Sequence, residues 1–453
     1  MTYDTFKAAG QGIVLIASAV MLLASGALPS AQAMNIQKVV SEKGIEAWLV
    51  EDHSLPLISM QFAFRGGAAQ DPAGKPGVST FVTSMLDEGA GDLDSQAFQQ
   101  RMEELAVRLN FSTSADHITG SFQTLTKNRD EALNLLKLAL TKPRFDPADA
   151  DRIRAQIISR IQFDDKDPDR VASREWFKLA FNGHPYSQPN SGTLESLPKI
   201  TTDDLRAFVG RTVARDNLKV AVVGDVTAAD LKRMLDDVFG GLPEKSSLLP
   251  VAEVTWPTGY RRKIVEMPNP QSVAQFGFQG LKRKDPDFIP GYILNYIVGG
   301  GGFASKLMEE VREKRGLAYS VYTYLYPLDR TGIFAGSVAT ENKEVGRSLE
   351  VIKAELDRIA KEGPTEQELR NAKDYLIGSF ALRFDTSTKI AAQLLSLQLD
   401  ELGIDYIDKR NALIEAVSMD DMKRVAKRLL GSDTLIVTVV GKPDGMTDVG
   451  LTN

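Results

Sequence analysis

This sequence offers no thiols and only three imidazoles for metal binding or catalysis. The 453 residues contain no cysteine, which excludes disulfides, thiolate metal sites and a cysteine nucleophile. The imidazoles are limited to His53, His117 and His184, and no two of them are close in the sequence. We interpret His117, which lies in a strand-like run, as a packed residue rather than a ligand. The histidines therefore form no recognisable metal-binding or catalytic motif.

A cation and a phenol lie on either side of a predicted helix end. Arg312 lies near the end of a predicted helix (304–314), Gly316 follows that helix, and Tyr319 begins the next predicted strand. A guanidinium and a hydroxyl fixed in this way can bind a carbonyl and stabilise an oxyanion. The alternative is structural: Arg312 is one charge of a solvated helix face, and Tyr319 is a core aromatic residue. These residues alone favour the structural alternative.

A second stretch places hydroxyl groups on a predicted helix. The run 77–86 predicts the first turns of a helix, after a strand-like run and a loop that begins at Arg65. Thr80, Thr83 and Ser84 lie on this helix. Hydroxyls are poor zinc ligands, and none of the three can act as a base near neutral pH. The helix therefore offers no metal or acid–base chemistry of its own.

Charge and motif content argue against nucleic acid and nucleotides as partners. The formal net charge is −6 and there is no basic footprint, so nucleic acid is not an expected partner. The run Gly299–Gly302 lacks the Lys-Ser/Thr of a phosphate-binding loop, and we interpret it as a flexible connection. A chain of this length can bury the cores of more than one domain.

The N-terminus reads as an export signal. Residues 13–28 are apolar or small, and Ala31-Gln32-Ala33 forms an A-x-A cleavage pattern. The apolar run is short for a membrane span, so we expect cleavage after Ala33 and no stable span afterwards; an uncleaved anchor is the alternative. In a bacterium, the mature chain would then be periplasmic.

The remaining elements form an α+β pattern that occurs twice. Alternating strand-like runs and amphipathic helices in the first half have counterparts, in the same order, in the second half. The corresponding stretches are 58–64 and 273–278, 112–122 and 318–325, and 202–224 and 419–441. We read residues 110–122 as one strand.

A stretch rich in Gly, Pro, Ser and charge separates the two halves. We therefore predict five parts of the chain. These are a signal peptide (1–33), an N-terminal domain (34–243), a linker (244–260), a C-terminal domain (261–445) and a tail (446–453).

This organisation resembles the insulinase (pitrilysin) family of inverted zinc peptidases. The likeness covers nearly the whole mature chain, and residues 303–321 closely resemble the signature of the family's C-terminal domain. The resemblance implies two homologous α+β halves, each an antiparallel-rich sheet with packed helices, which together form half of a peptide chamber.

The resemblance also implies that the zinc site of the family is degenerate here. The family helix carries H-x-x-E-H, with two zinc-binding histidines and a glutamate that activates water. Those histidine positions correspond to Thr80 and Ser84, and the glutamate position to Thr83. The third ligand of the family, a glutamate, corresponds to Arg160, whose guanidinium cannot bind a metal. We therefore expect no metal and no cofactor in this chain.

Two sets of residues remain as candidates for contact with a peptide. The family's C-terminal arginine and tyrosine, which reach across the chamber to the substrate, correspond to Arg312 and Tyr319, and this match favours their functional role. Asn110, Phe111 and Ser112 match the family edge strand that pairs with a peptide through its backbone. By pattern alone, an interior strand fits these three residues equally well.

The leading hypothesis is a non-catalytic subunit of a heterodimeric periplasmic zinc peptidase. Its partner would be a zinc-bearing homologue, and its ligand an unfolded or short peptide. A stand-alone peptide-binding or assembly protein of the same fold is the first alternative. A peptidase with another metal arrangement is the second.

Overall fold

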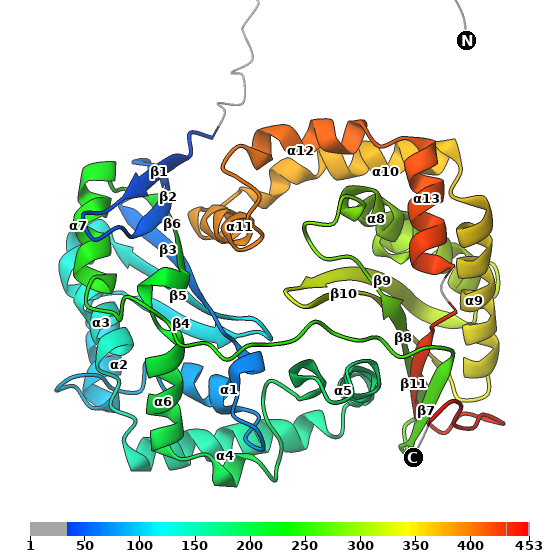
Figure 1. The fold of residues 1–453 in the computed structure, drawn as a ribbon, viewed down its shortest axis with the longest axis horizontal. Coiled ribbons are helices and arrows are strands. Elements are labelled where there is room, and N and C mark those ends of the chain that lie inside the picture. The colour runs from blue at the N-terminus through cyan, green and yellow to red at the C-terminus, as the bar shows by residue number, and fades with distance from the viewer. Residues whose placement is uncertain (1–33, 432, 452–453) are drawn as a thin grey trace, which may run out of the picture. The chain divides into compact units, whose positions relative to one another are not determined.

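Two β-sheets, one from each half of the sequence, carry the fold (Figure 1). The computed structural model describes residues 34–431 and 433–451, so the predicted signal peptide (1–33) lies outside the described residues. The N-terminal sheet has the order β1 (Gln37–Val40), β2 (Glu46–Glu51), β6 (Leu218–Gly224), β3 (Leu57–Arg65), β5 (His117–Leu125) and β4 (Arg108–Thr113). The C-terminal sheet has the order β7 (Arg261–Glu266), β11 (Ile436–Gly441), β8 (Gln271–Gln279), β10 (Thr331–Glu341) and β9 (Ala318–Leu328).

The two sheets share one topology once β1 is set aside. In each sheet, the last strand of its half (β6 or β11) pairs in parallel with one neighbour and antiparallel with the other. The helix before that strand begins with a capping box in both halves, formed by Thr201 with Asp204 and by Ser418 with Asp421. The α+β class and the two homologous halves are confirmed.

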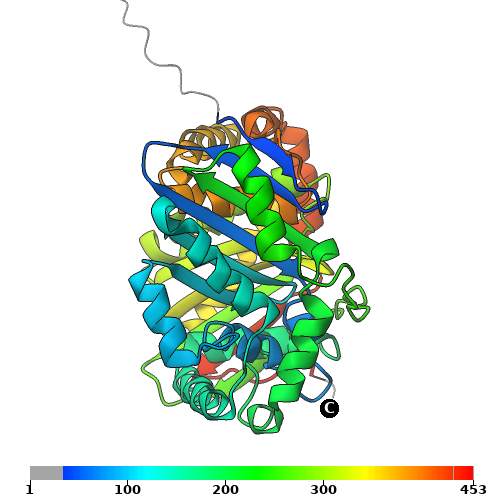
Figure 2. The same ribbon diagram turned by 90° about the vertical axis from the view of Figure 1, so that its left-hand side faces the viewer.

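Helices cover the outer face of each sheet. Figure 2 shows the N-terminal sheet with its covering helices toward the viewer. The helices of the first half are α1 (Val78–Thr83), α2 (Ser95–Glu104), α3 (Arg129–Thr141), α4 (Pro147–Asp164), α5 (Pro168–Ala180), α6 (Thr202–Thr212) and α7 (Ala228–Phe239). Those of the second half are α8 (Phe288–Asn295), α9 (Val345–Glu362), α10 (Glu366–Gly378), α11 (Ser387–Leu399), α12 (Tyr406–Glu415) and α13 (Met419–Leu430). None of the described helices combines the length and apolar character needed to cross a bilayer.

The halves exchange one helix each across their inner faces. Helix α5 of the first half packs on β8 and β11, and α11 of the second half packs on β3 and β6 (Figure 1). The indole N–H of Trp176 donates to the Ile436 carbonyl at 3.0 Å, and the Gln398 amide donates to the Val220 carbonyl at 2.9 Å. Each central strand is thus buried on both faces, which explains the almost unbroken apolar sequence of β6 and β11.

The predicted linker forms hydrogen bonds with both halves of the molecule, and the predicted tail forms them with the C-terminal half. Residues 244–260 contain no helix or strand, and they cross from one sheet to the other (Figure 1). The Leu249 N–H donates to the Gln70 side chain at 2.7 Å, and the Trp256 indole donates to the Thr331 hydroxyl at 2.8 Å. In the tail, Val449 forms an isolated bridge with Arg262.

Two sequence-based expectations were wrong. Residues 110–122 form a hairpin rather than one strand: β4 ends at Thr113, and the Ser114 N–H donates to the His117 carbonyl at 2.8 Å. The run Gly299–Gly302 is not simply a flexible connection, because its first two residues complete a π-helical turn, Tyr296–Gly300. A Cβ at Gly299 would lie 2.6 Å from the Thr323 amide nitrogen, so glycine lets this turn approach β9 closely.

Candidate functional site

The hydroxyls of α1 are occupied by backbone carbonyls. Helix α1 starts after Gly77, whose φ of 101° favours glycine, and it is shorter than the predicted run 77–86. The Thr80 hydroxyl donates to the Asn190 carbonyl at 2.6 Å. The hydroxyls of Thr83 and Ser84 donate to the Thr80 carbonyl at 3.0 and 2.9 Å. These groups stabilise the helix and a neighbouring loop, and the three hydroxyls do not share one acceptor.

Arg160 does not complete a metal site. Its side chain is 68% exposed and pairs with Asp164, one turn along α4, at 3.3 Å. Thr80 and Asp164 both line a cavity of about 450 Å³ between α1, α4, α5 and β9, but Arg160 does not. Hydroxyls and a guanidinium are the wrong donor set for zinc. Among residues 34–431 and 433–451, no group of three His, Asp or Glu side chains is placed to hold a metal ion.

The side chains of Arg312 and Tyr319 are in contact. The guanidinium carbon of Arg312 lies 4.5 Å from the Tyr319 ring centroid and 4.8 Å from that of Phe303. Arg312 lies in a π-helical segment, Met308–Glu313. Such segments shift the direction of the side chains that follow and recur at functional sites.

A β-bulge presents Tyr319. Ser320 pairs with Ala339 and Ala318 with Thr340, so Tyr319 is the extra residue of β9. Its side chain is 79% exposed, which excludes the core-aromatic alternative. The phenol therefore stands free at the edge of the C-terminal sheet, beside the guanidinium of Arg312.

Arg312 differs from the neighbouring charges in having no ion pair within the part of the chain that the structure describes. Lys314 pairs with Glu309 and Glu310 at 2.8 and 2.6 Å, and Arg315 pairs with Glu310 at 2.6 Å. Hydrogen bonds from Lys306 and Lys314 lower the pKa of Glu309 to about 2. Glu309 and Glu310 are thus engaged by other cations, and the guanidinium of Arg312 has hydrogen-bond donors available for a ligand oxygen.

Strand β4 lies at the edge of the N-terminal sheet, so the interior-strand alternative is wrong. The hydrogen bond from Ser114 to His117 makes these two residues a hydrogen-bonded pair of the hairpin. Hydrogen-bonded and non-hydrogen-bonded pairs alternate along an antiparallel ladder, so the pairs Ser112–Thr119 and Asn110–Ser121 are also hydrogen-bonded. The backbone groups of Asn110 and Ser112 therefore bond to β5. Those of Phe111 point to the free edge, while its side chain is buried in the core.

The tyrosines of β9 were not singled out from the sequence. Tyr322, Tyr324 and Tyr326 pair across to Ser337, Ala335 and Ile333, on the face that α5 partly covers. The exposed fractions of Tyr322 and Tyr326 are 48% and 41%. Their alternation in the sequence is the signal that could have identified this row of aromatic side chains.

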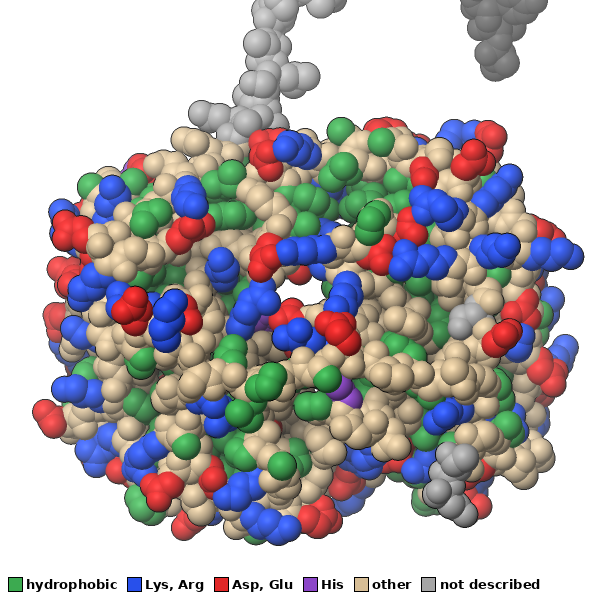
Figure 3. Space-filling view, in the orientation of Figure 1, with side chains coloured by type: hydrophobic (Ala, Val, Ile, Leu, Met, Phe, Trp, Pro, Cys, Tyr) green, Lys and Arg blue, Asp and Glu red, His purple; other side chains and the backbone are tan. Residues whose placement is uncertain are grey.

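A charged cavity of about 500 Å³ lies where the halves meet. An opening surrounded by Lys, Arg, Asp and Glu side chains is visible near the middle of Figure 3. Arg65 pairs with Asp329 at 3.1 Å, and Tyr186 donates to Asp116 at 2.5 Å. Burial raises the pKa of Asp116 and lowers that of His117, whose Nε2 has no partner among the described residues. The buried imidazole of His117 thus lacks one hydrogen bond. The cluster of charged side chains links the two halves.

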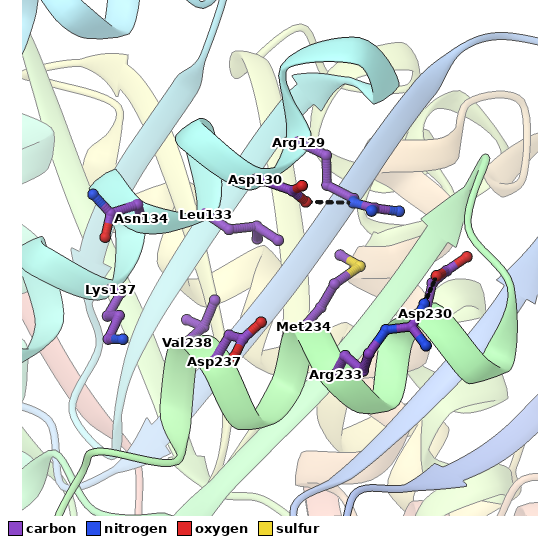
Figure 4. A pocket seen from close by; sticks show the side chains of 10 residues that line it. All are labelled: Arg129, Asp130, Leu133, Asn134, Lys137, Asp230, Arg233, Met234, Asp237 and Val238. Atoms are coloured by element: carbon purple, nitrogen blue, oxygen red, sulfur yellow. Dashed lines mark hydrogen bonds and ion pairs between the residues drawn. The ribbon is translucent and has the colours of Figure 1, made fainter.

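A hollow on the outer surface, between α3 and α7, does not gather functional groups (Figure 4). Its volume is about 340 Å³ and its floor is apolar. Arg129 pairs with Asp130 at 2.9 Å, and Arg233 pairs with Asp230. These charges are neutralised within their own helices, and we assign no site to this hollow.

Comparison with family models identifies the fold. The model of the insulinase family (peptidase family M16) matches residues 49–194, and that of the peptidase M16 inactive domain matches residues 199–376. The chain belongs to the insulinase family. Within it, the chain is 28% identical over 340 residues to the non-peptidase homolog YmxG of Helicobacter pylori, covering 74% of this chain and 78% of that protein. It is 23% identical over 389 residues to the mitochondrial-processing peptidase subunit beta of Lentinula edodes, covering 83% of each.

Two solved structures share this architecture. A crystal structure of a peptidase M16 inactive domain from Pseudomonas fluorescens has a TM-score of 0.86 and 28% identity, covering 91% of this chain and 99% of that one. A protease from Helicobacter pylori has a TM-score of 0.82 at 18% identity, covering 90% and 99%, and this match concerns the fold alone.

Proposed function

We propose that this chain is the non-catalytic subunit of a heterodimeric zinc peptidase, exported to the periplasm, that supplies Arg312 and Tyr319 to the active site of a zinc-bearing partner of the same family. The observation that carries the proposal is the contact between an unpaired guanidinium and an exposed phenol, 4.5 Å apart. Helix α1, by contrast, has only hydroxyls at the catalytic positions. The name of the Helicobacter pylori relative, a non-peptidase homolog, agrees with this division of roles.

The chemistry of this chain would be binding and charge stabilisation. The fork of N–H groups on Arg312 would hold a peptide carbonyl next to the scissile bond. The Tyr319 hydroxyl would donate a hydrogen bond to the oxygen that becomes negative in the transition state. Zinc in the partner would supply the activated water. The free edge of β4 would align the peptide as an added strand.

A stand-alone peptide-binding protein is the second candidate. It is supported by the presence of a free strand edge, exposed tyrosines and an unpaired arginine in one chain. Both candidates allow the isolated chain to bind peptide, but the stand-alone candidate requires no partner and no gain in proteolysis on mixing with one.

Reconstitution distinguishes the two candidates. The mature chain is mixed with a zinc-bearing family member from the same organism, and the mixture is analysed by size-exclusion chromatography and by cleavage of a quenched fluorescent peptide. The subunit proposal predicts a co-eluting complex that is more active than either chain alone. Separate elution with no gain in activity contradicts it.

The isolated chain provides the control. We expect elemental analysis to find no stoichiometric zinc in it, and we expect no peptide cleavage, because three hydroxyls and a guanidinium occupy the ligand and base positions. One tightly bound zinc per chain, with proteolysis that a chelator stops, would overturn both candidates in favour of a peptidase with another metal site.

A further inference from the structure

Phe303 is a large apolar side chain with 68% of its surface exposed. Its ring and that of Tyr319 both lie within 5 Å of the guanidinium carbon of Arg312, at 4.8 and 4.5 Å. The guanidinium of Arg312 thus contacts both rings. An arginine held by two aromatic rings is restricted in the directions that its N–H groups can take.

The backbone fixes the position of Phe303. Gly302 has a φ of +58°, a conformation that other residues rarely adopt, and it opens a tight turn, Gly302–Ala304. The Ser305 hydroxyl closes the turn by donating to the Gly302 carbonyl at 2.7 Å. A Cβ at Gly301 would lie 2.7 Å from the Tyr296 carbonyl oxygen. The glycine run thus directs Phe303 onto Arg312.

We propose that Phe303 is a positioning residue that holds the Arg312 guanidinium against Tyr319 and so sets the plane in which it meets a peptide. The inference rests on the proposed function, because the ligand is the same peptide. With two rings packed against it, the guanidinium has fewer directions in which its N–H groups can meet a ligand, and its planar fork suits the carbonyl or carboxylate oxygens of an extended chain. Phe303 acts through Arg312 and need not touch the reacting bond.

A double-mutant cycle on peptide binding tests this role. The isolated mature chain is titrated into a fluorescein-labelled unstructured peptide, and the dissociation constant is read from fluorescence anisotropy. We expect Phe303→Ala to weaken binding about 5- to 30-fold, the range of a cation–π contact from a partly exposed to a dry site. Phe303→Tyr keeps a ring in place and should restore binding.

The Arg312→Ala background distinguishes a positioning role of Phe303 from a general apolar contact between Phe303 and the peptide. In Arg312→Ala, which has no cation to position, Phe303→Ala should have little further effect. Phe163, which is 70% exposed on α4, provides the matched control, and Phe163→Ala should bind as the wild type does. Equal losses in Phe303→Ala with and without Arg312, or an equal loss in Phe163→Ala, would overturn the inference.

A spectroscopic measurement keeps this inference separate from the proposed function. In arginine-labelled protein, the Arg312 Nε–H resonance, identified by its loss in Arg312→Lys, should shift and broaden in Phe303→Ala at an unchanged melting temperature. An unchanged resonance refutes positioning even where the chain binds peptide. If the wild type neither binds peptide nor raises a partner's turnover, the proposed function fails, and the role of Phe303 in peptide binding fails with it.

Discussion

At the scale of residues, the two candidate sites differ in where their polar groups are directed. The hydroxyls of Thr80, Thr83 and Ser84 point to backbone carbonyls, whereas the polar groups of Arg312 and Tyr319 stay available to a ligand. Because donors that are already bonded must break those bonds to bind anything else, the first set is structural. The second set keeps the polar groups that our proposal assigns to contact with a substrate.

Asp71, in the loop before α1, gives the molecule a pH dependence. Burial raises its pKa from 3.8 to about 6, although the Gly77 and Ser79 N–H groups donate to its carboxylate at 2.7 and 2.8 Å. The folded state therefore binds the proton more tightly than the unfolded state. The stabilisation is complete below about pH 4 and is lost as the pH rises through about 6; it is on the order of 2–3 kcal/mol.

Urea denaturation at pH 4.5 and 7.5 measures this contribution. In Asp71→Asn, we expect the difference between the unfolding free energies at the two pH values to shrink by an amount of that order. Asp203→Asn, which changes a carboxylate that is 92% exposed, should leave the difference as in the wild type. The same pH difference in Asp71→Asn and the wild type would disprove this assignment.

Residue types and spacing predicted part of the site. The helix, the glycine after it and the strand indicated how Arg312 and Tyr319 could act together, but only the family resemblance favoured that role over the structural alternative. Phe303 was not predicted, because its contact depends on a left-handed glycine and a π-helical segment that leave no periodic signal. Whether Arg312 forms an ion pair also depends on which cations pair with Glu309 and Glu310. Those pairings are set by three-dimensional packing and cannot be read from the sequence.

At the scale of elements, the free edge of β4 is the feature best suited to an extended peptide. The hairpin register turns the backbone groups of Phe111 and Thr113 outward. Sequence alternation gave the inward and outward side chains of this segment, but it could not show the turn at Ser114–His117 or the position at the sheet edge. Both depend on pairing with distant strands.

A proline at the free edge tests strand addition. Thr113→Pro removes an outward N–H that bonds to no other strand, so we expect stability close to that of the wild type. Peptide binding should weaken about 3- to 10-fold, which corresponds to the loss of one hydrogen bond. Thr113→Ala keeps the N–H and is the matched control. Equal affinities of the two variants, measured by anisotropy, would argue against pairing at this edge.

Helix α5 is one of the two helices that join the halves across their inner faces. Trp176 is fully buried, contacts the rings of Phe177, Phe181 and Trp256, and bonds to the Ile436 carbonyl of β11. We expect Trp176→Ala to lower the unfolding free energy by about 3–5 kcal/mol. Tryptophan fluorescence and circular dichroism should report one shared urea transition in the wild type, because the inner face of each sheet is covered by a helix of the other half. Two separate wild-type transitions would contradict this coupling.

At the scale of the whole molecule, the two halves repeat one topology but carry different candidate residues. Helix α1 of the first half has hydroxyls at the positions of the family's zinc motif, and the second half has Arg312 and Tyr319. The repeat was predictable from the sequence, since matching runs recur in order. The helix exchange was not, because α5 and α11 have the same amphipathic character whichever sheet they cover.

The turnover number of the purified heterodimer tests the central claim most directly. With Arg312→Lys or Tyr319→Phe in this chain, the account predicts that turnover falls by about 10²–10³, as on loss of one transition-state hydrogen-bond donor. Co-elution with the partner and the melting temperature should stay as in the wild type, because Tyr319 is exposed and neither change removes a buried group. Unchanged turnover in both variants would contradict the account, because the pair would then contribute nothing to the partner's active site.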